Sequence, residues 1–402
     1  MNVCLIWDSE YPWDVRLEKV ARSLTAAGHR VDIAARNRNR LPVVEVLPEG
    51  TVHRMPPIPG RSDRMEAALS FPAFVNPRWF ALVHAVATKG PADVILCRDL
   101  PLAPIAIAAG RRLGRPVVLD MAENYPAMIQ AVWDHGRQRP WDWLVRNPRA
   151  ARAVERWVVR RVDHTIVVVE ESRDRLVELG VDPDRITVSL NTPLGERIPS
   201  CVEPATPDLP LRLVYIGLLE APRGLSVVLR ALARCRDEDV PVQVEVVGDG
   251  RDRKILEDES VALGLGEDRV RFRGRLPYEE ALTVVRGAHV GIVPHLANES
   301  WNSTIPNKLF DYMSMGLPVV TSDARPAARI VSETGCGAVY PSHDPEALAL
   351  VIRSLLEPAV RAEKGARGRR AVLERFRWDV DGGRVVEAVE RAAGFRPPLE
   401  MA

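Results

Sequence analysis

The sequence predicts an α/β protein of two domains, each a parallel sheet covered by helices. Short β-branched runs alternate with longer amphipathic stretches, which is typical of βαβ units. The alternation breaks once, at residues 199–210, where four prolines and no periodicity indicate an interdomain linker, and then restarts. A length of 402 residues with 46% hydrophobic residues suits two domains with ample cores.

The expected elements follow in chain order. In the first half the expected strands are 3–7, 31–34, 94–97, 117–119, 165–169 and 187–190, with a helix at 16–27 that Gly28 ends. In the second half the strands are 213–216, 242–247, 270–272, 290–293 and 319–321, and the helices are 224–235, 251–262, 278–286 and 306–315. Two Rossmann-like doubly wound domains result: 1–200 with a returning C-terminal helix in 377–402, and 201–376. Ligands of such sheets bind beyond the carboxyl ends of the strands, so we expect the site there, in a cleft between the two sheets.

Composition and charge exclude several classes. A formal charge of +1 with 46% hydrophobic residues excludes a disordered chain and argues against a dedicated nucleic-acid binder. The five cysteines form no CxxC and have no histidine at metal-ligand spacing, so we expect buried free thiols and no metal. The N-terminus lacks the pattern of a signal peptide, and no apolar run approaches the ~20 residues of a membrane span. A cytoplasmic protein is expected, with contact to a membrane surface left open.

Two loops of the second half could approach a phosphate. Residues 215–224 leave a strand, turn at Gly217 and enter a helix just after Arg223. An arginine at a helix start suits an anion, although many such arginines simply face water. Residues 246–250 form a second turn, in which Gly248 lets backbone approach a ligand; a structural turn explains it equally well.

Two further stretches follow. Residues 269–277 are a strand and a tight turn that carries Arg273. Residues 304–320 begin a helix near Asn307 and Lys308, where free backbone N–H groups and an ammonium would hold an anion. Asp311 lies on the same helix face as Lys308 and could accept a ribose diol. An ordinary ion pair between these two residues is the alternative.

The four stretches, in this order and spacing, resemble the C-terminal domain of family 4 retaining glycosyltransferases of the GT-B fold. That family shows a GxxxxxKG turn, then VVGDG, RVxFxG and PxKxFEYMAxGxPVV, matched here over residues 211–337. The resemblance implies a nucleotide-sugar donor, with no metal or other cofactor. It places Arg223 and Lys308 on the diphosphate, Asp311 on the ribose and the turn after Arg273 against the base.

This sequence also departs from the family pattern. The family pairs two acids eight residues apart, whereas here Ser303 stands at the first position and Asp311 at the second. Ser303 or Thr304 could still bond a sugar hydroxyl, without charge. Leu218 stands where the family often has arginine, so Arg223 and Lys308 would carry the diphosphate between them.

The first half would bind the acceptor. Residues 119–126 resemble the family's DxHE run, with Ala122 at the histidine position and Glu123 retained as an orienting group or base. A loop carboxylate satisfied by backbone N–H groups is the alternative for Glu123. Arg16 at a helix start, with Arg98 and Asp99 just past a strand, are the other expected acceptor contacts.

One segment raises the question of a surface partner. Residues 133–161 hold Trp133, Trp141, Trp143 and Trp157 among eight arginines. Such a helix can dock on an anionic membrane or an acidic carrier protein, or can simply cover the domain. Family members that act on lipid-linked acceptors keep the membrane reading open.

The expected function is therefore a retaining hexosyl- or N-acetylhexosaminyltransferase. By the resemblance, the donor is a UDP-sugar such as UDP-N-acetylglucosamine, and the catalytic residues are Glu123, Arg223 and Lys308. The acceptor would offer a hydroxyl or amine on a glycan intermediate, a lipid-linked or carrier-bound molecule, or a natural product. Front-face displacement asks mainly for positioning and charge stabilisation, so no nucleophile is required. A non-catalytic protein of the same fold, or a nucleotide-sugar epimerase, is the alternative.

Overall fold

The computed structural model describes residues 1–395 except 13, 59, 61–64, 66–72, 136–146 and 203–208. The chain divides into two compact units: Met1–Asn191 with Trp378–Ala402, and Thr192–Arg377. The expected linker 199–210 lies partly outside the described residues. Its first residues belong to the second unit, because Arg369 donates hydrogen bonds to the carbonyls of Pro199 and Ser200.

The first unit is built on an eight-stranded sheet. Its order is β3 (Val44–Leu47), β4 (Gly50–Arg54), β2 (Arg30–Ala35), β1 (Asn2–Ile6), β5 (Val94–Arg98), β6 (Val117–Met121), β7 (His164–Val167) and β8 (Ile186–Val188). All neighbours pair in parallel except β3 and β4, which form an antiparallel hairpin at one edge. The strand order reverses between β1 and β5, where ligands of such sheets bind.

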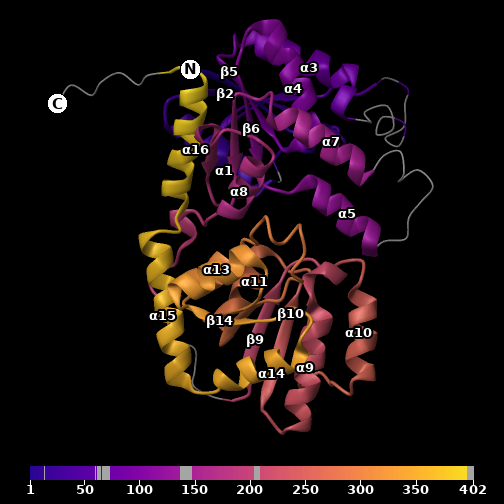
Figure 1. Cartoon of the computed structure of the whole chain (residues 1–402), viewed down its shortest axis with the longest axis vertical. Coiled ribbons are helices and arrows are strands. Elements are labelled where there is room, and N and C mark those ends of the chain that lie inside the picture. The colour runs from indigo at the N-terminus through magenta and orange to yellow at the C-terminus, as the bar shows by residue number, and fades with distance from the viewer. Residues whose placement is uncertain are drawn as a thin grey trace, which may run out of the picture. The chain divides into compact units, whose positions relative to one another are not determined.

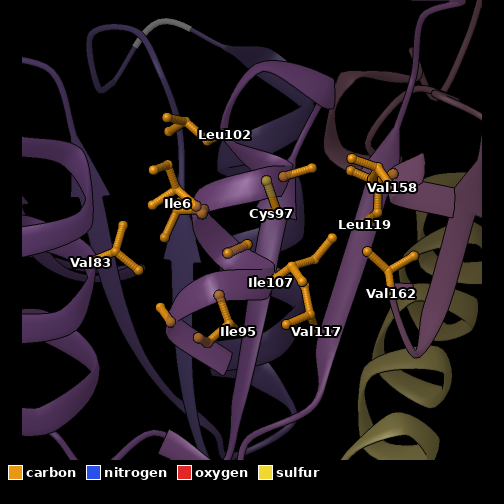
Figure 2. Packing of buried hydrophobic residues seen from close by; sticks show 14 of the residues in the cluster. Ile6, Val83, Ile95, Cys97, Leu102, Ile107, Val117, Leu119, Val158 and Val162 are labelled. Atoms are coloured by element: carbon orange, nitrogen blue, oxygen red, sulfur yellow. The ribbon is translucent and has the colours of Figure 1, made fainter. Parts of the chain in front are cut away.

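Helices cover both faces of this sheet. They are α1 (Val15–Ala26), α3 (Pro77–Lys89), α4 (Ala103–Leu113), α5 (Tyr125–His135), α7 (Pro148–Val159), α8 (Glu170–Glu178) and α16 (Trp378–Ala392). Helices α3, α4 and α7 enclose the core, in which Ile6, Cys97 and Leu119 meet Val83, Ile107 and Val158 (Figure 2). The C-terminal helix α16 returns to this unit and packs beside α1 (Figure 1).

The second unit has a six-stranded, wholly parallel sheet. Its order is β11 (Val270–Gly274), β10 (Val242–Val247), β9 (Leu211–Ile216), β12 (Val290–Val293), β13 (Val319–Ser322) and β14 (Gly337–Tyr340). Its helices are α9 (Leu225–Asp237), α10 (Arg253–Ala262), α11 (Tyr278–Arg286), α12 (Lys308–Ser314), α13 (Arg325–Thr334), α14 (Pro345–Ser354) and α15 (Pro358–Glu374). The core under α9 and α14 is aliphatic, and α12 packs against α15. Here the strand order reverses between β9 and β12.

The two-unit α/β architecture is confirmed, and every expected strand is present with small shifts at its ends. The sequence analysis missed β3, β4 and β14. Strand β3 lies at the edge of the sheet, and its Val44 and Val46 are exposed. The sequence of β3 therefore lacks the apolar run that marks a buried strand. One cysteine prediction is wrong: four thiols are buried, but Cys201 is exposed because it stands on the loop that enters the second unit.

Candidate functional site

Lys308 is a buried cation at the carboxyl end of the second sheet. It opens α12, is 9% exposed, and its Nζ has no hydrogen-bond partner within the described residues. The ammonium lies 3.8 Å from the centroid of the Tyr215 ring, in a cation–π contact. On the loop after β9, a Cβ at Gly217 would come within 2.7 Å of Nζ, and the Gly217 φ is +141°. Gly217 is therefore required for the backbone to pass this close to the ammonium.

Arg223 ends the same loop, in a single turn of 3₁₀ helix before α9. Its guanidinium carbon lies 4.5 Å from the centroid of the Trp301 ring, and Nη1 lies 3.2 Å from His295 Nε2. No carboxylate in the described part of the chain forms an ion pair with it. The segments that follow β9 and β12 thus bring together two cations, neither of which forms an ion pair with a carboxylate of the described residues.

The electrostatics of this end of the sheet favour an anion. Burial, and next the charge of Arg223, hold the pKa of Lys308 well below its usual range, while Asp311 opposes the shift. Burial also lowers the pKa of His295, and Lys308 and Arg223 lower it further, so the imidazole is neutral. A buried cation without a partner is unfavourable until an anion reaches it. The placement of Lys308 and Arg223 therefore favours an anion here, and binding of a diphosphate by them stays a prediction.

Four further residues that the sequence predicts on the donor side lie in α12 or in the loop before it. Ser303 and Thr304 are buried in the loop before α12, and Ser303 Oγ donates to the carbonyls of Glu299 and Ser300. Asn307 stands at the N-cap position of α12 without a capping hydrogen bond from its side chain, and Asp311 lies near enough to Lys308 to influence its pKa. A sugar contact of Ser303 or Thr304 and a ribose contact of Asp311 stay predictions.

Gly248 and Arg273 lie at the ends of the neighbouring strands. Gly248 follows β10, and its N–H donates to the carbonyl of Gly274 over 2.8 Å. Arg273, on β11, forms an ion pair with Glu245 of β10, with Nε 2.6 Å from Oε2. This guanidinium therefore neutralises a carboxylate on the adjacent strand, and the contact of the turn after it with the base stays a prediction.

In the first unit the predicted acceptor residues Arg98, Asp99 and Glu123 come together with two other carboxylates. Arg98 Nη1 lies 2.8 Å from Asp99 Oδ1, and Nη2 lies 3.6 Å from Asp14 Oδ2. Asp99 Oδ1 also accepts from the Ala122 N–H, and its own N–H donates to the Asp120 carbonyl. Asp99 has a φ of +61°, which is unusual for a residue with a side chain. Backbone strain of this kind gathers at functional sites.

The Asp99 carboxyl of this cluster has a raised pKa. Burial raises its pKa to about 7 against the opposing charge of Arg98, with added repulsion from Glu123, Asp120 and Asp14. It can therefore gain or lose a proton near neutral pH. The sequence analysis named Glu123 as the candidate base, with an orienting group or a satisfied loop carboxylate as alternatives. Nothing local to Asp99 in the sequence reveals its burial.

Asp99→Asn is expected to change the free energy of unfolding more favourably at pH 8 than at pH 5, although at both pH values it removes a partner of the buried Arg98. The folded carboxyl holds its proton up to about pH 7, whereas the unfolded one loses it near pH 4, so the stability of the parent falls as pH rises through this interval. The effect of the substitution on the free energy of unfolding should be about 2–3 kcal/mol more favourable at pH 8 than at pH 5, because one pKa unit is worth about 1.4 kcal/mol. Urea unfolding of both proteins at the two pH values measures this difference. An equal effect of the substitution on the free energy of unfolding at the two pH values would contradict this prediction.

The prediction that Arg16 contacts a ligand is not supported by its surroundings. Its side chain is 2% exposed and forms a buried ion pair with Asp120, with Nε 3.1 and 3.0 Å from the two carboxylate oxygens. Nη1 donates to the carbonyls of Ser189 and Leu190. A helix-start arginine looks solvent-exposed in the sequence, and only the fold brings a carboxylate from β6 against it.

His295 and Trp301 are site residues that the sequence analysis missed. Their ring centroids are 4.0 Å apart, and both contact Arg223. The sequence offered one signal for His295, its position along the chain. His295 follows β12 by two residues and so lies beyond the carboxyl end of a strand, at the point where the strand order reverses.

The tryptophan–arginine segment is only partly described. Trp133 lies on α5 and Trp157 on α7, where Arg161 lies 4.7 Å over the Trp157 ring. Trp141 and Trp143 lie outside the described residues. Among the residues that the structure covers, no helix is long and apolar enough to span a membrane. Nor do three His, Cys, Asp or Glu side chains gather there in a way that could hold a metal ion.

Comparison with known proteins places both units in one group. Residues 14–192 match the model of the glycosyl transferase 4-like domain, and residues 210–358 match that of glycosyl transferases group 1. Phosphatidyl-myo-inositol mannosyltransferase of Mycobacterium leprae is 24% identical over 358 residues, 89% of this chain and 87% of that protein. D-inositol 3-phosphate glycosyltransferase of Thermomonospora curvata is 25% identical over 93% of this chain and 89% of that protein.

Solved structures show the same fold. Sucrose-phosphate synthase from Thermosynechococcus elongatus superposes with a TM-score of 0.78 at 18% identity, over 97% of this chain and 98% of that one. HepE of Anabaena in complex with UDP-glucose gives a TM-score of 0.69 at 16% identity, over 97% and 100% of the two chains. The chain therefore belongs to the group 1, family 4 glycosyl transferases and is a glycosyltransferase of the GT-B fold.

Proposed function

We propose that the protein is a retaining glycosyltransferase that uses a UDP-sugar, such as UDP-N-acetylglucosamine or a UDP-hexose. The observation that carries the proposal is the pair of unpaired cations, Lys308 and Arg223, beyond the ends of β9 and β12. A sugar nucleotide places two phosphates between its base and its sugar. Two neighbouring cations that form no ion pair with a carboxylate of the described residues suit that diphosphate.

Lys308 and Arg223 also suit the chemistry of transfer. As the bond between sugar and phosphate breaks, negative charge grows on the leaving diphosphate. Two cations that are already in place stabilise this charge without reorganisation, and they would do so without a metal ion or other cofactor. Asp311, beside Lys308, would accept the ribose hydroxyls, and Ser303 or Thr304 would bond a sugar hydroxyl.

The first unit would supply the acceptor contacts through Arg98, Asp99 and Glu123. A hydroxyl or amine acceptor must lose a proton as it attacks. A carboxyl that titrates near pH 7, as Asp99 does, can hold or receive a proton there. In a retaining front-face reaction the leaving phosphate takes part of this role, and Asp99 or Glu123 would then orient the acceptor.

The relatives support a nucleotide-sugar donor without fixing the sugar. Structures of HepE are described with UDP and with UDP-glucose, and an Escherichia coli trehalose-6-phosphate protein with UDP-2-fluoro glucose. Two relatives in sequence are named for transfer involving inositol compounds. The proposed acceptor is a glycan intermediate, a lipid-linked or carrier-bound molecule, or a natural product. We propose that the transfer takes place at the cytoplasmic side, with peripheral membrane contact where the acceptor is a lipid.

A non-catalytic protein of the same fold is the alternative that specific residues favour. Ala122 stands where the family often has histidine, Leu218 where it often has arginine, and Ser303 where it often has an acid. Such a protein would have no need to keep two neighbouring cations that form no ion pair with a carboxylate of the described residues. The retained pair favours an enzyme, and it favours one that binds a diphosphate over an epimerase with acid–histidine chemistry.

Thermal unfolding with UDP, GDP, ADP and dTDP at matched concentration tests the donor site. A nucleotide at ~100 times its dissociation constant should stabilise the protein by ~2.7 kcal/mol. We expect UDP to do so, and Asp311→Ala to weaken the effect. The matched control is Asp344→Ala, which removes a helix cap in the same unit and should leave the UDP effect intact. If no nucleotide stabilises the parent, the non-catalytic alternative takes precedence.

The stereochemistry has its own readout. Glycosyltransferases can hydrolyse their donor slowly when acceptor is absent, and proton NMR reports the anomer released first. An α-configured UDP-sugar should give the α-anomer. Initial release of the β-anomer would exclude the retaining mechanism and leave the donor site standing.

A further inference from the structure

The loop between β12 and α12, residues 294–307, holds His295 and Trp301 against Arg223. The loop is fixed to the Arg223 turn by the Leu296 N–H, which donates to the Pro222 carbonyl over 3.0 Å. Ser322 Oγ donates to the His295 carbonyl. A Cβ at Gly224, whose φ is +74°, would come within 1.8 Å of the Pro294 carbonyl oxygen. Only glycine lets the two segments meet this closely, so the Arg223 backbone and the loop are held as one piece.

The side chains of Arg223 and His295 lie next to each other on the indole of Trp301. The guanidinium carbon is 4.5 Å and the imidazole centroid 4.0 Å from the Trp301 rings, while Arg223 Nη1 is 3.2 Å from His295 Nε2. Opposite faces of the indole would put these nitrogens too far apart to interact. Both groups therefore rest on one face of the indole, edge to edge.

The contact with Arg223 fixes the protonation of His295. A guanidinium has donors only, so Nε2 must accept, and the single proton of the neutral ring is on Nδ1. Burial and the charges of Lys308 and Arg223 keep the ring from gaining a second proton. His295 thus serves as a neutral acceptor that holds the Arg223 cation in place and leaves its charge intact. A carboxylate at this position would cancel that charge.

We infer that His295 and Trp301 are positioning residues that fix the Arg223 guanidinium for the donor diphosphate. The inference rests on the proposed function. An arginine side chain loses considerable rotamer entropy when a ligand immobilises it. Trp301 stacks on the guanidinium and His295 accepts one of its N–H groups, so much of that ordering is complete before the diphosphate arrives. The remaining N–H donors and the full positive charge stay available to the phosphate oxygens.

A pair of amide substitutions at His295 separates this role from mere filling of space. The glutamine oxygen in His295→Gln can occupy the place of Nε2 and accept from Arg223, whereas the shorter side chain of His295→Asn cannot reach it. We expect His295→Gln to bind UDP with nearly the parent affinity and His295→Asn to bind it about tenfold more weakly. That fold-change is what one hydrogen bond is typically worth, ~1.4 kcal/mol. Calorimetric titration with UDP measures both.

Substitutions of Trp301 and the binding of uridine test the inference further. Trp301→Leu should weaken UDP binding and Trp301→Phe should retain most of it, since an aromatic face remains. Binding of uridine, which has no phosphate, should be the same in all of these variants. A general disturbance of the fold would weaken uridine and UDP alike, and would overturn the inference.

The matched control is His289, a second buried histidine in contact with an arginine. Its Nδ1 accepts from the Arg212 backbone N–H over 3.1 Å and its Nε2 lies 2.7 Å from Arg212 Nη2. It stands just before β12 and so at the opposite end of the same sheet. His289→Asn should leave UDP affinity unchanged. Equal UDP affinity of His295→Gln and His295→Asn would overturn the inference while leaving the proposed function intact. If the parent itself binds no nucleoside diphosphate, the proposed function fails, and the inference fails with it.

Discussion

Lys308→Met is expected to raise the thermal midpoint of the free protein and to abolish its stabilisation by UDP. The lysine ammonium is buried without a hydrogen-bond partner in the described structure and lies near a second cation, Arg223. Methionine has a similar length and can rest on the Tyr215 ring through its sulfur, as Nζ does through its charge. Removing the charge therefore relieves an unfavourable burial, while the diphosphate loses a cation.

The two halves of this result exclude different alternatives. A structural lysine would make the methionine variant less stable, and a residue with no ligand would leave the UDP effect in place. Lys254→Met is the control, because Lys254 is exposed and pairs with Asp258 one helical turn away. It should change neither the midpoint nor the response to UDP. A Lys308→Met protein that is less stable and still responds to UDP would contradict the assignment of Lys308.

Local sequence patterns were sufficient for most of the fold. Buried parallel strands such as β5 and β12 are almost entirely apolar runs, and helix α9 has an apolar face of helical period, so tertiary context only confirms what these segments already prefer. The edge hairpin of β3 and β4 has no such pattern. It forms because β4 finds β2 beside it in parallel, which no short segment of sequence can show.

At the candidate site, too, the sequence predicts contacts within one segment but not contacts between distant segments. Lys308 and Asp311 are three residues apart, and their proximity follows from helical spacing alone. The contact of Arg223 with His295 joins residues 72 positions apart. It depends on the strand order, which makes β9 and β12 neighbours, so the sequence marks Arg223 but not the groups that hold it.

Arg16→Ala is expected to destabilise the protein by about 3–5 kcal/mol, because it leaves the Asp120 carboxylate buried without its main partner. Burial alone would raise the pKa of Asp120, but the charges of Arg16 and Arg98 outweigh it and hold that pKa below its usual range. Without Arg16 this balance is lost, and the carbonyls of Ser189 and Leu190 lose a shared donor. Urea unfolding at neutral pH measures the loss. Arg22→Ala, an exposed position of the same helix, should fall within about 0.5 kcal/mol of the parent.

A double substitution distinguishes an internal ion pair from a ligand contact. Arg16→Met with Asp120→Leu removes both charges and should recover much of the stability that Arg16→Ala loses, since buried pairs can often be replaced by apolar side chains of similar size. Binding of UDP should be unchanged in this double variant as long as it is folded. If Arg16→Ala were as stable as the parent and had lost acceptor or phosphate binding, Arg16 would be the ligand contact that its position at a helix start suggests. The buried, two-point contact between Arg16 and Asp120 favours the structural role, because a guanidinium that already donates to a carboxylate and two carbonyls has little left to offer a substrate.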